Sequence, residues 1–162
     1  MPVGKRSDPE GKEAEKQLAC FIAKFKPEIG ALARAVRAAM RKRFPTALEL
    51  VYENYNALAI GFAPTEKTSE SIFSIALYPN WVSLFFLQAR ELPDPKEMLK
   101  GTGKVARHIV LSSWQTLDDP AVEALIRKAA IRAKVTFNSA AKHQLIIKSV
   151  SARQRPRRPP AQ

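Results

Sequence analysis

Four short apolar segments follow one another between residues 47 and 88, and they limit the folds open to this chain. They read "ALELVYEN" (47–54), "ALAIGFAP" (57–64), "SIFSIALYP" (71–79) and "WVSLFFLQ" (81–88). The first two alternate with the two-residue period of a β-strand, and their apolar positions are Leu48, Leu50, Tyr52 and Leu58, Ile60, Phe62. The residues between the segments, such as Asn54–Asn56 and Pro79–Asn80, favour tight turns. The pattern therefore predicts an antiparallel meander.

Helical patterns flank this meander on both sides. Apolar residues recur at three- and four-residue spacing from about Glu13 to Pro27, and again from Pro27 to Pro45. A third such stretch, residues 118–135, opens with an Asp–Asp–Pro sequence that is typical of a helix start. A fifth strand is expected at about 106–111, and "QLIIKSV" (144–150) is a candidate for a last strand.

These elements predict one α+β domain over residues 13–150. We expect an antiparallel β-sheet of five or six strands, with two N-terminal helices and one C-terminal helix packed on one face. Residues 1–12 and the arginine- and proline-rich residues 151–162 have the composition of disordered ends.

The third and fourth strand segments are apolar on both faces. Such strands are central in a sheet, or their second face is covered by something else. We expect a homodimer to provide that cover. The alternative is that the third helix and the C-terminal segment cover the face within one chain.

The composition limits where the protein works and what it meets. The longest apolar runs are far shorter than the ~20 residues of a membrane span, the N-terminus lacks the apolar core of a secretory signal, and Cys20 is the only cysteine. We therefore expect a cytoplasmic protein with no membrane partner. The net charge of +12 favours polyanions as partners.

Two sequence stretches, "YENYNALAIGFAP" and "LKGTGKVARHIVL", occur in an order of elements that resembles the YdhG-like superfamily. The similarity spans about residues 18–133. The resemblance implies a small bacterial α+β domain of a family whose members are mostly of unknown function. Some members are described as frataxin-like iron chaperones, but iron binding needs clustered carboxylates, and this chain is basic.

The "GTGK" sequence at 101–104 raises the question of a phosphate site. A P-loop requires a longer spacing and a helix after the glycines, whereas a strand is expected here. The preferred interpretation is a turn that uses the conformational freedom of glycine. The alternative is a small anion-binding site, formed by Lys100, Gly101, Gly103, Lys104 and Arg107.

No metal, cofactor or nucleophile motif stands out. His108 and His143 have no further ligand at metal-binding spacing, so we expect no metal and no cofactor. Cys20 lies near Lys16 and Lys24 on its helix but has no neighbouring base, which favours an inert surface thiol.

Glu49 and Glu53 fall on the opposite face of the first strand segment from Leu48 and Leu50. On an outer sheet face beside small residues, they could form a shallow groove for a ligand with Tyr52 and Tyr55. A solvated outer face is the alternative. The enzyme alternative rests on this group of residues or on Cys20.

Basic residues are better organised. On the second helix, arginines recur opposite the apolar stripe, and the C-terminal tail adds four more. We expect weak, sequence-independent contacts to nucleic-acid phosphates from Arg34, Arg37, Arg41, Arg153, Arg155, Arg157 and Arg158. The leading functional prediction is a non-enzymatic binding module with an unknown small-molecule ligand. Nonspecific nucleic-acid association and an unrecognised enzyme remain as alternatives.

Overall fold

The computed structural model describes residues 9–159, and it is an α+β fold with a single six-stranded sheet. Three helices and the strands follow in the order expected from the sequence. They are α1 (Pro9–Ala23), α2 (Pro27–Arg43), β1 (Leu48–Glu53), β2 (Leu58–Ala63), β3 (Phe73–Leu77), β4 (Val82–Phe86), β5 (Arg107–Leu111), α3 (Pro120–Arg132) and β6 (Leu145–Val150). Two short 3₁₀ turns, Thr68–Glu70 and Trp114–Asp118, lie between them. The predicted fold class is confirmed.

The helices begin where the sequence provides a suitable first turn. α1 begins at Pro9, four residues earlier than expected, so residues 9–12 are helical and the predicted disordered N-terminus is wrong for them. Residues 1–8 lie outside the described residues. Pro27 occupies the first turn of α2, where its missing N–H costs nothing. Asp119 caps α3 by accepting a hydrogen bond from the Ala121 amide.

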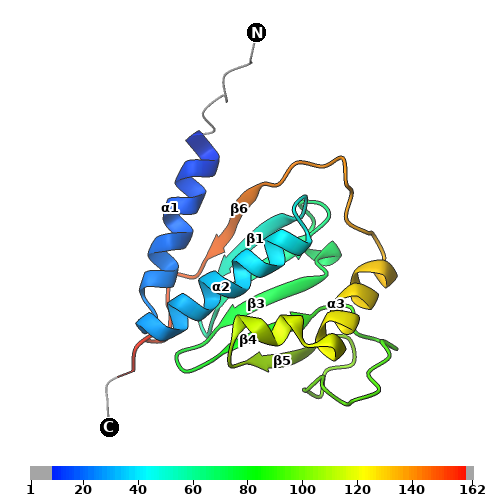
Figure 1. The fold of residues 1–162 in the computed structure, drawn as a ribbon. Helices are drawn as coiled ribbons and strands as arrows, with labels where there is room; N and C mark the ends of the chain where they lie inside the picture. Colours follow the sequence, from blue (N-terminus) through cyan, green and yellow to red (C-terminus); the bar gives the residue numbers. More distant parts are fainter. Residues whose placement is uncertain (1–8, 160–162) are drawn as a thin grey trace.

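The sheet has the strand order β5-β4-β3-β2-β1-β6. β1 to β5 form the predicted antiparallel meander, and β3 and β4 each have a strand on both sides. β6 is parallel to β1, so the sheet is mixed and not wholly antiparallel as expected. A parallel strand follows because the chain crosses from β5 at one edge over the helix layer to the opposite edge through α3 and residues 133–144 (Figure 1).

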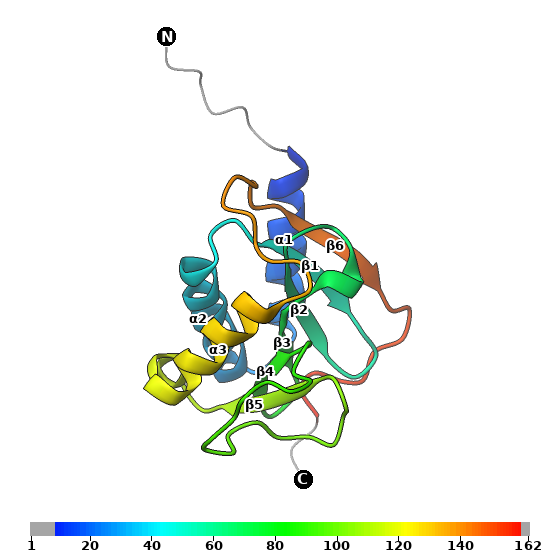
Figure 2. The same ribbon diagram turned by 90° about the vertical axis from the view of Figure 1, so that its right-hand side faces the viewer.

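All three helices cover the same face of the sheet (Figures 1 and 2). The core between the layers joins Leu18 of α1 and Val36 of α2 to the inward side chains of the central strands. Phe73 is fully buried there and packs against the rings of Phe44 and Phe86 at centroid distances of 5.4 and 5.6 Å. Burying side chains of this size contributes roughly 1.5–3 kcal/mol each.

The orientation of β1 differs from the prediction. Its register pairs Glu49 with Phe62 and Glu53 with Leu58, so both carboxylates point to the helix side and are fully buried. Leu50 points to the other face, where it is buried in a smaller apolar cluster. The expected inward face of β1 was therefore wrong, and the physical reason is that each glutamate has an arginine partner inside the fold.

Candidate functional site

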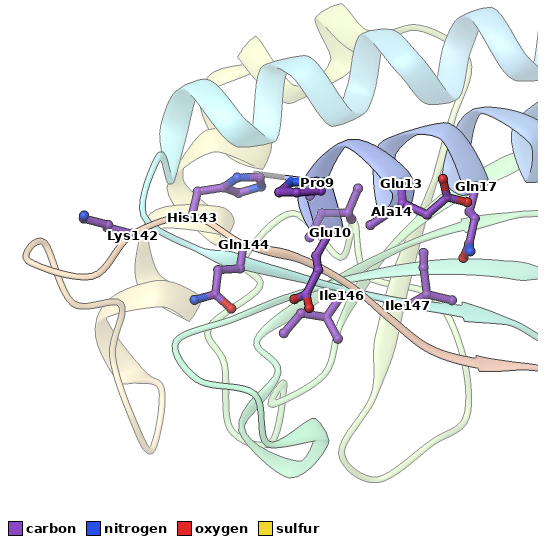
Figure 3. A pocket seen from close by; sticks show the side chains of 12 residues that line it. Pro9, Glu10, Glu13, Ala14, Gln17, Lys142, His143, Gln144, Ile146 and Ile147 are labelled. Carbon is purple, nitrogen blue, oxygen red and sulfur yellow. The ribbon is translucent and has the colours of Figure 1, made fainter. Parts of the chain in front are cut away.

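A groove lies between the first turns of α1 and the chain that leads into β6 (Figure 3), with a volume of about 720 Å³. One wall is residues 142–147. The other wall belongs to α1 and consists of Pro9, Glu10, Gly11, Glu13, Ala14 and Gln17. In Figure 3 the side chain of Glu10 reaches from α1 toward Ile146, and His143 lies at the end of α1 beside Pro9. The lining combines apolar and hydrogen-bonding groups, as ligand sites do.

A second hollow of about 370 Å³ adjoins the first. Both are lined by Gly11, His143, Gln144 and Leu145, and the second adds Lys12, Glu15 and Arg41. His143 therefore stands where the two hollows meet.

Buried charges behind the groove fix the position of His143. Its Nε2 lies 2.8 Å from Glu49 Oε1. Arg37 of α2 donates to the same carboxylate, from Nε at 2.6 Å and from Nη2 at 2.9 Å. The guanidinium also donates to Glu15 of α1, with distances of 3.1 and 2.8 Å. These contacts tie α1, α2, β1 and the segment before β6 to one buried carboxylate, with the strong geometry of a side-on arginine pair.

The protonation of this cluster follows from its partners. Burial alone would raise the pKa of Glu49, but the hydrogen bonds from His143 and Arg37 outweigh it, and the pKa lies below its usual value. The pKa of Arg37 is raised because its two carboxylate partners outweigh the effect of burial. Glu49 is therefore ionised at neutral pH and accepts its bonds, so Nε2 of His143 carries the proton and donates.

A carboxylate that orients an imidazole is an arrangement used in acid–base catalysis. In this chain the arrangement holds the wall of the groove in shape and offers His143 to a ligand as a hydrogen-bonding group.

The predicted outer-face groove of Glu49, Glu53, Tyr52 and Tyr55 does not form. Both glutamates lie beneath the helices, whereas Tyr52 faces the other side, where its hydroxyl hydrogen-bonds Thr68. Tyr55 is exposed in the turn after β1. The correction has the same cause as the orientation of β1: the carboxylates are paired with arginines and need no solvent.

The arginines of α2 divide into different environments. Arg34 is exposed, and Arg41 is 42% exposed, with its Nε 3.5 Å from Glu49 Oε1. Arg37 is only 14% exposed, because α1 and β1 cover that flank of α2. Arg37 is therefore not available to a phosphate, contrary to the expectation from the sequence.

The C-terminal segment is also not the expected disordered tail, as far as it is described. Residues 151–159 run back past the turn after β1, where Arg157 is buried against Glu53. Arg158 donates to carbonyl groups at the end of α1. Arg153 and Arg155 are exposed. Residues 160–162 lie outside the described residues.

The "GTGK" sequence forms a turn before β5, which was the preferred interpretation of the sequence. Gly101 has a φ of +110°, which only glycine adopts easily, and Arg107 donates to its carbonyl. A Cβ at Gly103 would lie 2.8 Å from the Ala106 carbonyl oxygen. The glycines are thus explained by the backbone, and the anion site with Lys100 and Lys104 stays a prediction.

Sequence reasoning missed His143 as part of a site. It is 94 residues from Glu49, and only the parallel pairing of β6 with β1 brings the two together. No spacing signal in the sequence announces such a pair. His108, by comparison, packs beside the Phe85 ring on the other face of the sheet, at 5.1 Å between ring centroids.

Comparison with protein-family models, with curated proteins and with solved structures gives no match to this chain. Within residues 9–159, no group of three or more histidine, cysteine, aspartate or glutamate side chains is placed to hold a metal ion. No helix in that part of the chain is both long and apolar enough to cross a bilayer. The YdhG-like resemblance and the homodimer stay predictions.

Proposed function

We propose that this protein is a non-enzymatic binding module that holds a ligand in the groove between α1 and β6. The observation that carries the proposal is the groove itself, backed by a buried Glu49–Arg37 pair that fixes His143 where the two hollows meet. As part of the same proposal we keep the resemblance of the chain to the YdhG-like superfamily, whose members are mostly of unknown function.

The groove can be tested by filling it. Gln144 is exposed and lines both hollows, so Gln144→Trp blocks them without disturbing the core. A thermal-shift screen of metabolites, nucleotides and metal ions is expected to give a ligand that raises the Tm of the wild type. That shift should disappear in Gln144→Trp and persist in Gln115→Trp, a matched change at an exposed glutamine outside the groove. A ligand that stabilises both variants equally would contradict the use of the groove.

Weak association with nucleic acid is a second candidate, supported by the net charge of +12 and by the exposed Arg34, Arg41, Arg153 and Arg155. Each neutralised phosphate contributes a slope of about −0.9 in log affinity against log salt on duplex DNA. The double change Arg153→Ala and Arg155→Ala should therefore make the slope shallower by about two units at most. The loss should be the same on unrelated sequences, because phosphate contacts carry no base information.

The measurement is a filter-binding or anisotropy titration of two unrelated labelled duplexes over a range of salt concentrations. If neither duplex binds at low salt, the basic surface serves solubility and does not bind nucleic acid.

A further inference from the structure

Beyond the groove, the turn after β1 and the end of α1 together form a second site, which we call the arginine socket. It consists of the Glu53 carboxylate, the carbonyl oxygens of Asn54 and Tyr55, and the ring of Phe25. We propose that the arginine socket recognises a peptide of a partner protein that carries two consecutive arginines, and that the chain's own C-terminal segment fills it in cis. This inference does not depend on the function of the groove.

The socket surrounds a guanidinium on several sides. Arg157 Nη2 donates to Glu53 Oε1 at 2.5 Å and to the Asn54 carbonyl at 2.6 Å, and Nη1 donates to the Tyr55 carbonyl at 3.2 Å. The guanidinium carbon lies 5.3 Å from the centre of the Phe25 ring, which is a cation–π distance. Glu53 is fully buried and Arg157 is 4% exposed. A lysine could supply the charge but not the planar fork that meets these acceptors.

The next arginine has its own acceptors. Arg158 Nε donates to the carbonyl of Phe25 at 2.8 Å, and Nη2 donates to that of Ala23 at 3.0 Å. Ala23 is the last residue of α1, where the final carbonyls lack intrahelical partners and the helix dipole favours a cation, and Phe25 follows in the turn toward α2. The main chain adds two bonds, from the Ser151 amide to the Glu53 carbonyl and from the Arg155 amide to the Tyr55 carbonyl. The site therefore binds two consecutive arginines, which lie at a bend of the backbone.

The segment that fills the socket does not complete its hydrogen bonds. Glu53 Oε2 and Arg157 Nε are both buried without a hydrogen-bond partner. Lys24 Nζ lies 3.7 Å from Oε2, which is an ion pair without a hydrogen bond. Arg157 thus meets the carboxylate with one nitrogen, whereas a free peptide can turn its guanidinium side-on and use both oxygens. Buried polar groups left unpaired are costly. A peptide that pairs both oxygens of Glu53 therefore binds the socket more favourably than the chain's own segment does.

The covering segment is also suited to leave. It follows β6 and contains no helix or strand over residues 151–159. Segments that are held by side-chain contacts and lack a helix or strand open at lower free energy than the packed elements of a fold. While it is in place, its tethering gives it a high effective concentration that an external peptide has to exceed. The cis segment therefore competes with the external peptide, and the socket can bind that peptide only when the segment has left it.

The probe for this site is a fluorescein-labelled synthetic peptide with the sequence of residues 151–159, SARQRPRRP. At roughly 0.15 M salt, which screens surface charges beyond about 8 Å, it should bind full-length Arg157→Ala at least tenfold more tightly than wild type. A probe with lysine in place of both consecutive arginines should bind the variant at least tenfold more weakly. Adding Glu53→Gln to the variant should abolish binding. Arg157→Lys, which keeps a charge over Glu53, is the second variant in case Arg157→Ala does not fold.

Several results would overturn the proposal. One is that the probe binds neither Arg157 variant although both have native circular dichroism. Another is that the probe binds wild type and Arg157→Ala equally tightly, or that the lysine probe binds Arg157→Ala as tightly as the arginine probe does. The last is that binding to Arg157→Ala survives the addition of Glu53→Gln. Analytical sedimentation distinguishes an external partner from a second copy of this chain as the occupant of the socket. A wild-type dimer that disappears in Arg157→Ala would assign the socket to the tail of a second copy and overturn the external partner.

Discussion

Replacing Arg37 with alanine is expected to lower the free energy of unfolding by about 3–5 kcal/mol. The substitution removes the side-on partner of Glu49 and leaves that carboxylate fully buried beside His143 and the more distant Arg41. An uncompensated buried charge is far more costly than the net value of the pair itself. The change also releases Glu15, so α1 loses its ion pairs with Arg37 of α2.

The matched control is Arg34→Ala, one turn earlier on the same helix. Arg34 is exposed, so its loss should change stability by no more than about 0.5 kcal/mol. Urea unfolding followed by circular dichroism measures both variants. Equal stabilities would mean that the Arg37–Glu49 pair is as solvated as a surface salt bridge. The two variants thus distinguish Arg37, which stabilises the fold, from Arg34, which is exposed and available to polyanions.

The helices and the meander could be predicted because their signals are local. The apolar residues of α1 and α2 recur along one stripe, proline and aspartate mark the helix starts, and asparagine and proline mark the turns. The "GTGK" turn belongs to the same class, since its glycines serve the backbone of residues 101–106. Each of these features is decided within a few residues.

The features that sequence reasoning missed depend on partners far along the chain. Alternation in β1 places Leu48 and Leu50 inside and Glu49 and Glu53 outside, but both faces of this strand are covered. What decides the orientation is a pair of arginines, one 12 residues before Glu49 and one 104 residues after Glu53. The composition of the C-terminal segment gives no sign that Arg157 is buried, because the socket lies in another part of the sequence.

Replacing Glu49 with glutamine is expected to lower the free energy of unfolding by about 3 kcal/mol at pH 7. Glutamine keeps the shape of the side chain but removes the charge that faces Arg37, and it replaces one of the two oxygens that accept from Arg37 with an NH₂ donor. Arg37 would then keep only Glu15 as a charged partner. The matched control is Glu66→Gln, at an exposed position in the loop after β2, with an expected change below about 0.5 kcal/mol.

The pH dependence of this difference follows from the direction of the pKa. Because the pKa of Glu49 in the folded protein lies below the ordinary value of 4.5, the unfolded chain takes up the proton first as the pH falls. The stability that Glu49 provides is therefore complete above about pH 4.5 and is lost as the pH falls through the lower, folded value. Urea unfolding of wild type and Glu49→Gln at pH 7, 5, 4 and 3 should show a constant gap down to about pH 5 that closes at lower pH. A gap that stays unchanged down to pH 3 would mean that the carboxylate is not stabilised in its charged form by Arg37 and His143.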